Sequence, residues 1–386
     1  MSWGETLLHG DRLGYQLTGT TPKPLAGILG LLASPLPPER AMGVVVALAL
    51  GILVAALFLA AERRSGSAAG LIAVVVFLVA ANLADVLAYQ LVDAVTAALV
   101  AVALAARGRA RVGTLIVAGL LRPEAWALAG VAAVGEANRR RLLAAVSAVA
   151  AAPALWLAYD AIVTGDPLAT AHRTDDLLAP ARSWGGVLAS LADRISWVGF
   201  VLVALACLGF ALRRHADVAL PVATIVVWPL VLVFEAHSGL PLAPRYLLPP
   251  LVAVSLAVSL LVPRLAPRWI AAAGAAAAVL VFALTIDFGA DRWAQRAGEI
   301  ESAAPVVEPV LDCGTVGIAD VERKEGAYTG ALAAATGRSL QEFVHPLAAT
   351  GGVIRRRPED FTPPNGWDEV STPLGPLFVS PACRSS

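Results

Sequence analysis

Charged residues are scarce in this chain: they make up 15% of its 386 residues, whereas soluble domains carry about 25%. The two signs also cancel, because Lys+Arg and Asp+Glu number 29 each. So little charge and no net charge exclude a nucleic-acid-binding protein and a disordered chain. Hydrophobic residues reach 58%, more than the single core of a soluble enzyme accounts for at this length. The composition therefore predicts an integral membrane protein.

Cysteine is also rare, and the three cysteines differ in their surroundings. Cys207 lies inside an apolar block, where a lone cysteine usually serves as a small hydrophobic residue. Cys313 and Cys383 lie in a polar C-terminal tail. Two cysteines in a polar tail outside the cytoplasm form a disulfide more often than they bind a metal, so we expect a disulfide, with a metal site as the alternative.

The apolar residues gather into blocks separated by arginine clusters. About 20 helical residues cross the ~30 Å hydrocarbon core of a bilayer, so these blocks predict a polytopic α-helical membrane protein with about eight spans, several of them short. The blocks are Ala41–Ala61, Ala68–Ala81, Leu91–Ala106, Leu142–Val163, Trp197–Leu212, Val218–Glu235, Tyr246–Val262 and Trp269–Ile286.

The stretch 112–135 differs from these blocks because Arg122-Pro123-Glu124 interrupts its middle. Arginines flank it on both sides, at Arg111 and at 139–141, so both of its ends should lie on the same side of the membrane. Two short helices that are broken at the proline and form a hairpin satisfy this condition better than one span does.

Arginine placement predicts the orientation. With the tight clusters inside, twelve arginines lie in the cytoplasm and four lie in the opposite short loops: Arg173, Arg182, Arg194 and Arg245. Both termini then lie outside the cytoplasm, and residues 1–40 have no signal peptide to carry them across. We expect that the chain lacks an upstream helix; unaided translocation of this first extracytoplasmic segment is the alternative.

After the multi-span domain (residues 41–286), the composition changes. Residues 287–386 hold nine Arg+Lys against fourteen Asp+Glu. Strands are expected at Thr315–Ala319, Gly352–Arg355 and Leu374–Ser380, and a helix at Tyr328–Arg338. These elements predict a small extracytoplasmic C-terminal α/β domain. No internal repeat is visible, which argues against a transporter built from inverted repeats.

Charges near membrane depth are costly and therefore indicate candidate sites. Asp85, Tyr89 and Asp93 share one helical face by their spacing. The two carboxylates could bind a divalent cation, position an acceptor hydroxyl or act as a base; the alternative is the polar side of an interfacial helix.

Two arginines near helix ends are further candidates. Arg122, held by Glu124, could face a lipid or substrate phosphate, or the two could form an ion pair that neutralises itself. Arg245 precedes Tyr246 at the start of a span, where it could bind a lipid phosphate through its planar guanidinium or anchor the helix at the interface.

The loop 164–196 is the longest connection between the expected spans. It carries His172-Arg173, with Asp160, Asp166, Asp175 and Asp176 in or beside it. A loop of this length is often functional, or lies on the membrane as an amphipathic helix. We find no zinc-ligand spacing, nucleophile elbow or phosphate-binding glycine loop.

Five motifs taken in order resemble the GT-C superfamily, in particular the branch of protein O-mannosyltransferases and bacterial aminoarabinose or mannosyl transferases. They are ETLLHGDRLGYQLTGTTPKPLAGILG, QLVDAVTAALVAVAL, LLRPEAWAL, LWLAYDAIVTGDPLATAHR and APRYLLPPLVAVSLA. In the same order, they resemble five features of that family: its first extracytoplasmic loop, its second acidic position, its Arg/Lys-Pro turn, its span that ends in Gly-x-Pro, and the RYLLP start of one of its late helices.

The resemblance implies an inverting transfer of a hexosyl or pentosyl group from a polyprenyl-phosphate donor to a glycan, lipid or protein acceptor of the cell envelope. Lys23, Arg122 or Arg245 would stabilise the leaving lipid phosphate. Asp93, together with Asp85, would supply the catalytic carboxylates. Tyr246, His172 and Arg173 would line the site, and a divalent metal ion is a cofactor to consider.

One departure from the family pattern leaves two readings open. The family's catalytic Asp follows its first membrane helix, a position that would precede Met1 here, and Glu5 and Asp11 come too late in the motif to match it. The chain is then either a glycosyltransferase whose start was assigned too far downstream, or an inactive relative that serves as a scaffold or lipid-binding protein. A transporter or flippase is a more distant alternative.

Overall fold

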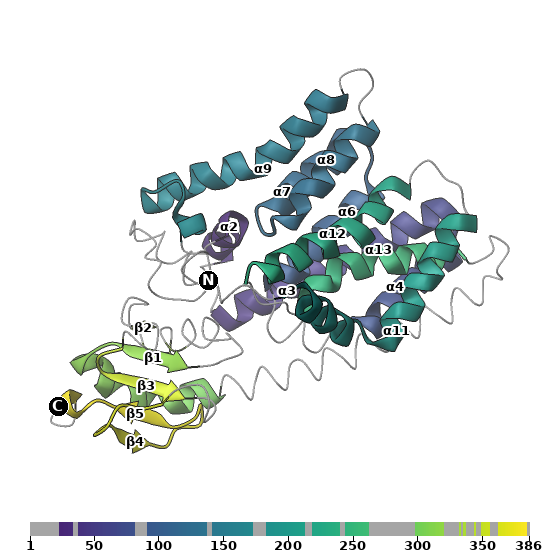
Figure 1. Cartoon of the computed structure of the whole chain (residues 1–386). Helices are drawn as coiled ribbons and strands as arrows, with labels where there is room; N and C mark the ends of the chain where they lie inside the picture. Colours follow the sequence, from purple (N-terminus) through teal and green to yellow (C-terminus); the bar gives the residue numbers. More distant parts are fainter. Residues whose placement is uncertain are drawn as a thin grey trace. The chain divides into compact units, whose positions relative to one another are not determined.

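The structure is a computed structural model, and most of what it describes is helical (Figure 1). The described residues are 23–33, 38–81, 91–136, 141–172, 183–212, 218–239, 244–261, 298–319, 332, 335–336, 343–344, 349–355 and 362–383.

The chain divides into two compact units. The first, which we call the helical unit, comprises Gly43–Tyr159 and Asp176–Gly289. The second, the tail unit, comprises Met1–Met42, Asp160–Asp175 and Ala290–Ser386.

Apolar helices make up the described part of the helical unit. They are α3 (Pro38–Ser65, from Gly43 on), α4 (Ser67–Ala80), α6 (Leu91–Ala105), α7 (Gly108–Gly119), α8 (Glu124–Glu136), α9 (Arg141–Thr164, to Tyr159), α11 (Trp184–Leu212), α12 (Ala219–His237) and α13 (Leu248–Ser259), which follows the 3-10 turn η2 (Pro244–Leu247). Helix α13 packs against α4, α6, α11 and α12, and α8 packs against α7 and α12.

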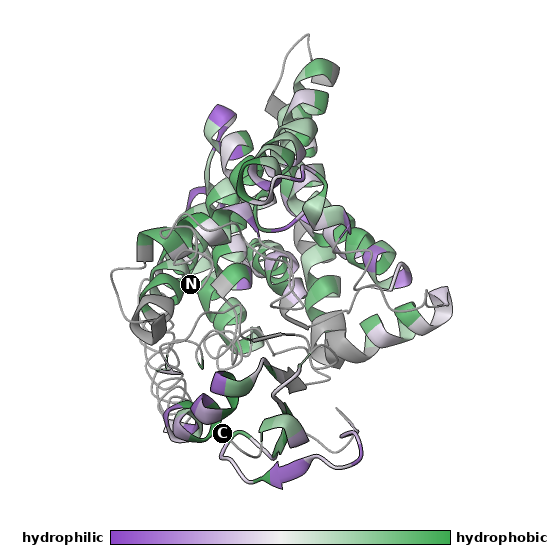
Figure 2. Cartoon of the chain, turned by 90° about the vertical axis from the view of Figure 1, so that its left-hand side faces the viewer, coloured by the Kyte–Doolittle hydropathy of each residue, from purple (hydrophilic) through white to green (hydrophobic). Residues whose placement is uncertain are grey.

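Helix length and outward-facing side chains both support a membrane location. Among the described residues, three helical segments are long and apolar enough to cross a bilayer: Val44–Ser65, Leu143–Thr164 and Ala219–His237. These segments also expose large apolar side chains, such as Leu48 (62%) on α3 and Phe234 (63%) on α12. Figure 2 shows that hydrophobic residues, in green, predominate along the described helices. A helix that is apolar on its outer face as well as its inner face suits a lipid environment.

Several of the expected spans are short helices in the structure. Four further apolar helices have only 10–17 residues: Ser67–Ala80, Val92–Ala105, Glu124–Val134 and Leu248–Ser259. The block Trp269–Ile286 lies outside the described residues. The expected break at Pro123 is present, since α7 ends at Gly119 and α8 begins at Glu124.

The expected loop 164–196 is wrong at its C-terminal end, because α11 already begins at Trp184. Val187 and Leu191 follow one another at helical spacing and contribute to the apolar core, so this stretch packs as a helix although Asp193 and Arg194 interrupt its hydrophobicity. The predicted apolar block Trp197–Leu212 is therefore only the second half of α11.

The C-terminal part of the tail unit is an α/β fold, with five strands in the order β2-β1-β3-β5-β4. The strands are β1 (Val316–Ala319), β2 (Phe343–Val344), β3 (Gly352–Arg355), β4 (Asp368–Val370) and β5 (Leu377–Val379). Strand β1 runs parallel to β2 and β3, whereas β5 pairs antiparallel with β3 and β4.

A helix at residues 298–313 supplies the other half of this core. Its buried Ala303 and Val307 belong to the same apolar cluster as Val316 and Leu377 of the sheet. Gly314 follows the helix and lies against the backbone of Gly351: a Cβ at Gly314 would come within 2.8 Å of the Gly351 nitrogen. The tail unit also contains α2 (Pro24–Ala33).

A disulfide joins Cys313 to Cys383, with 5.5 Å between the Cα atoms. This is the pairing that the sequence favours over a metal site. It ties the end of the 298–313 helix to the last described turn, Pro381–Cys383. Only three residues of the expected helix Tyr328–Arg338 are described, namely 332 and 335–336, and all three are helical.

Candidate functional site

The turn between α7 and α8 carries a buried arginine. After Gly119 the chain closes through two bonds to the Ala118 carbonyl, which accepts the backbone N–H groups of Leu121 and Arg122 at 3.0 Å each. The Trp126 indole N–H of α8 donates back to the Gly119 carbonyl at 2.9 Å. These bonds satisfy groups that helix ends leave open, and so they hold Arg122 in a fixed place inside the helical unit.

The guanidinium of Arg122 has three neighbours from separate parts of the helical unit. Its Nε donates to Asp93 Oδ1 of α6 at 3.0 Å, and Nη2 donates to the same oxygen. Nη1 lies 3.9 Å from Glu124 Oε1, at the start of α8. On another side, Cζ lies 3.9 Å from the centre of the Tyr246 ring of η2, a cation–π contact.

All three charged residues of this cluster are buried: Arg122 is 9% exposed, Asp93 6% and Glu124 1%. Two carboxylates therefore share one guanidinium in an apolar interior. Asp93 takes the hydrogen bonds of Arg122, whereas neither carboxylate oxygen of Glu124 has a hydrogen-bond partner. Glu124 is in the first turn of α8, where the helix dipole favours a negative charge.

Tyr246 is itself held by α12. The Trp228 indole N–H donates to the Tyr246 carbonyl at 2.9 Å, and Trp228 is fully buried. The cluster consequently connects α6, the α7–α8 turn and η2, with α12 behind η2. In this arrangement the buried charges of Arg122, Asp93 and Glu124 partly neutralise one another, and their contacts hold these segments together.

The sequence-predicted residues fall into separate groups. The structure brings together Asp93, Arg122, Glu124 and Tyr246, which come from three different candidate motifs. Arg245 precedes Tyr246 in η2. Asp85 and Arg173 lie outside the described residues, and Lys23 immediately precedes α2 in the tail unit.

A metal ion has no evident ligand set in the part of the chain that the structure describes. No group of three or more His, Cys, Asp and Glu side chains there lies close enough together to hold one. Asp93 and Glu124 supply two carboxylates, but both adjoin the guanidinium of Arg122, whose positive charge disfavours a cation beside it.

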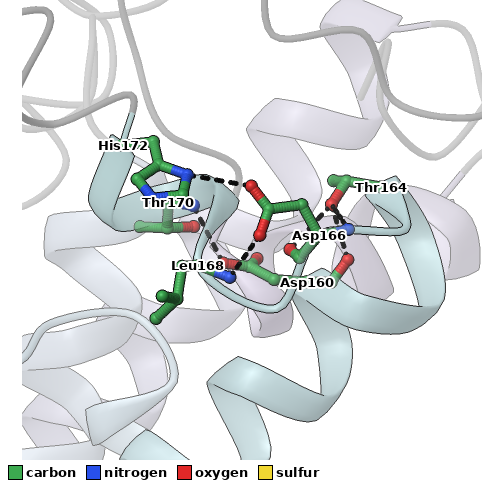
Figure 3. Close-up of polar contacts among 6 residues, drawn as sticks. All are labelled: Asp160, Thr164, Asp166, Leu168, Thr170 and His172. Carbon is green, nitrogen blue, oxygen red and sulfur yellow. Dashed lines mark hydrogen bonds and ion pairs between the residues drawn. The ribbon is translucent and has the colours of Figure 1, made fainter.

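A second polar cluster follows the end of α9, in the tail unit (Figure 3). Helix α9 ends at Thr164, and Gly165 (φ 84°) adopts the left-handed conformation that turns the chain. The Thr164 hydroxyl donates to the Asp160 carbonyl at 2.7 Å and accepts the Asp166 N–H at 3.1 Å. The buried Asp160 carboxylate accepts the Thr170 N–H at 3.0 Å, which fixes the next helical turn.

Asp166 and His172 meet across this turn. Asp166 Oδ1 accepts the Leu168 N–H at 2.9 Å, and Oδ2 lies 2.9 Å from His172 Nδ1. The bond from Leu168 and the hydrogen bond with His172 hold the pKa of the Asp166 carboxyl below its usual range. Both side chains remain open to solvent, at 47% for Asp166 and 65% for His172.

The sequence indicates His172 as a candidate site residue and places Asp166 in the same loop, but it does not predict the contact between them. The available signal was Asp166-Pro167 directly after a helix end, because Asp before Pro favours a turn. His172 comes six positions after Asp166. Only the fold of the intervening turn shows that their side chains meet.

Comparison with known proteins identifies a similar fold. No protein-family model and no curated protein matches the chain. Among solved structures, the chain is similar to the crystal structure of ArnT from Cupriavidus metallidurans bound to undecaprenyl phosphate, with a TM-score of 0.51 and 14% identity. The likeness covers 98% of this chain and 91% of that one. It shows that the helical fold of this chain resembles that of ArnT.

Proposed function

We propose that this chain is a membrane glycosyltransferase that moves a sugar from a polyprenyl-phosphate donor to an acceptor on the extracytoplasmic face, with inversion. The likeness in fold to an ArnT whose crystal structure holds undecaprenyl phosphate carries the proposal, because it extends over 98% of the chain. The five GT-C-like motifs support it, since they occur in the expected order between residues 4 and 286.

The leaving group of this reaction is an anionic lipid phosphate, which needs a cationic side chain nearby. Arg122 already donates to Asp93, and its guanidinium is enclosed. The resemblance also names Lys23 and Arg245 as alternatives for this role, and we therefore propose that one of these two binds the phosphate. Arg122 and Asp93 then stabilise the fold around Tyr246.

A binding experiment tests the lipid partner. The full chain, purified in detergent, is titrated with undecaprenyl phosphate while its tryptophan fluorescence is recorded, and undecaprenol without phosphate is the control ligand. We expect saturable binding of the phosphate lipid alone. Either Arg245→Ala or Lys23→Ala should weaken it about tenfold or more, since a charge-assisted phosphate contact is worth about 1.5–3 kcal/mol. Equal binding of both lipids would contradict the proposal.

A transfer experiment tests the reaction. Undecaprenyl-phosphate-linked hexoses and pentoses carrying a radiolabelled sugar are incubated with the protein and with cell envelopes as the source of acceptor. The label should pass into envelope material with release of undecaprenyl phosphate.

A non-catalytic, lipid-binding membrane protein is the second candidate. The observation that favours it is the ion pair of Asp93 with Arg122, because it engages the proposed acidic residue in the interior of the helical unit. This candidate predicts binding of undecaprenyl phosphate without transfer from any member of the donor panel.

A further inference from the structure

We propose that His172, oriented by Asp166, is the general base that removes the proton from the acceptor hydroxyl. The inference rests on the proposed glycosyl transfer and assigns a residue to its acceptor side. Two side chains carry it, both located in the turn that follows α9 (Figure 3).

The contact between the two side chains determines which nitrogen of His172 can accept a proton. An ionised carboxylate only accepts hydrogen bonds, so His172 Nδ1, 2.9 Å from Asp166 Oδ2, must be the donor. The lowered pKa of Asp166 keeps that carboxyl ionised near neutral pH. In the neutral ring, Nε2 then carries the free lone pair, as a general base requires.

The turn also fixes the position of the pair. Asp166 is held through Oδ1 by the Leu168 N–H, and its own N–H is held by Thr164. The His172 N–H donates to the Leu168 carbonyl at 2.9 Å, and Asp160 fixes Thr170 between them. A base placed on such a turn loses little freedom when its substrate arrives.

Stability alone does not account for this arrangement. An ion pair or hydrogen bond between side chains that are 47% and 65% exposed adds little to folding, because water screens it. The same exposure leaves the imidazole ring within reach of an acceptor. The other histidine with a described side chain, His237, is stacked on the Trp184 ring with 3.8 Å between the ring centres.

The proposed step balances as follows. The acceptor oxygen attacks the anomeric carbon of the donor sugar and forms the new glycosidic bond. The bond between that carbon and the phosphate oxygen breaks, and polyprenyl phosphate leaves with the electron pair. The acceptor proton passes to His172 Nε2, and the imidazolium is stabilised by Asp166 until it returns the proton to water.

Substitutions in the full chain separate a base from a structural residue. We expect His172→Ala to lower kcat by about 10²–10⁴-fold with little change in the affinity for undecaprenyl phosphate. Free imidazole should restore part of the rate, because the removed ring was exposed. Asp166→Asn keeps an oxygen for the Leu168 N–H but presents an amide donor to Nδ1. The proton is thereby forced onto Nε2, and kcat should fall, as tautomer reversal predicts.

The controls are Asp166→Glu and His237→Ala. Asp166→Glu should recover part of the activity because it keeps the carboxylate. His237→Ala should transfer at the wild-type rate and show no response to imidazole. Wild-type elution on gel filtration and unchanged binding of undecaprenyl phosphate show that each variant is folded.

Each outcome decides one proposal. Transfer by the wild type together with imidazole-dependent transfer by His172→Ala supports the base. Transfer by His172→Ala at a rate close to wild type overturns the base and leaves the glycosyltransferase intact, as does a low rate that imidazole fails to raise. If the wild type transfers none of the donors, the proposed function is overturned, and the base with it.

Discussion

Asp93 and Glu124 contact the same buried guanidinium, yet they should respond very differently to neutralisation. Asp93→Asn and Glu124→Gln each remove one negative charge with almost no change in shape. Because Asp93 accepts both Arg122 hydrogen bonds and Glu124 accepts none, we expect only the first substitution to destabilise the protein.

The contacts give the size of the difference. Two charge-assisted bonds to Asp93 together contribute about 3–6 kcal/mol, and a neutral acceptor retains about half of that, so Asp93→Asn should cost about 1.5–3 kcal/mol. For Glu124, the attraction to Arg122 Nη1 across 3.9 Å is about 4 kcal/mol at an effective dielectric constant of 20. Burying that carboxylate costs several kcal/mol, so Glu124→Gln should change stability by no more than ~1 kcal/mol.

Thermal unfolding in detergent, followed by the fluorescence of the nine tryptophans, measures the difference. At about 2–4 °C per kcal/mol for a unit of this size, Asp93→Asn should lower Tm by about 3–12 °C, whereas Glu124→Gln should stay within about 4 °C of the wild type. Arg122→Gln removes the guanidinium that both buried carboxylates adjoin and should be the least stable of the three, with a loss of about 3–5 kcal/mol.

Glu308→Gln is the matched control, because Glu308 is exposed on the 298–313 helix and the substitution should leave Tm unchanged. The reasoning would be refuted by a Glu124→Gln variant that loses as much stability as Asp93→Asn. It would be refuted equally by an Arg122→Gln variant with the Tm of the wild type.

Two further predictions concern packing and the disulfide. Gly119→Ala should destabilise the protein by about 1–3 kcal/mol, because its Cβ would lie 2.5 Å from Trp126 Cδ1 and 2.8 Å from Ala152 Cβ. Gly113→Ala in the same helix is the control: its Cβ meets nothing within 4 Å, so it should stabilise the protein by about 0.5–1 kcal/mol. Thermal unfolding measures both effects, and Tm shifts of the same sign for the two variants would contradict the packing around Gly119. The disulfide spans 70 residues, so Cys313→Ser with Cys383→Ser should destabilise the C-terminal fold by about 4 kcal/mol in the chain-entropy model. Calorimetry with and without dithiothreitol checks this value, and a reductant-sensitive transition in the double variant would contradict the assignment.

The sequence predicts those elements whose conformation depends on local residues and not on tertiary contacts. The break at Pro123 follows from the missing N–H of proline, and the long apolar helices follow from their composition. Strand β4 was missed because all three of its residues are exposed and two are acidic, so only its pairing with β5 makes it a strand. For the same reason the start of α11 was placed too late, since tertiary packing extends it through charged residues.

The candidate site shows the same division. Spacing alone put Asp93 on the polar face of a helix, and adjacency put Glu124 beside Arg122. Nothing in either motif indicated that Asp93, 29 residues away, takes the hydrogen bonds of Arg122, because that choice depends on how α6 and the α7–α8 turn pack. Likewise, the Asp166–His172 contact depends on the turn between them and not on a sequence motif.

The ion pair between α6 and the α7–α8 turn also bears on how the chain enters the membrane during synthesis. Asp and Arg each cost about 2.5–3.5 kcal/mol when they are inserted singly at the centre of a span. Asp93 and Arg122 leave the ribosome within 29 residues of each other, and α6 and α7 pack together, so the two charges can neutralise each other before α12 and α13 are made. Insertion as a preassembled helical group is therefore favoured, and the later arrival of Tyr246 covers a charge that is already neutralised.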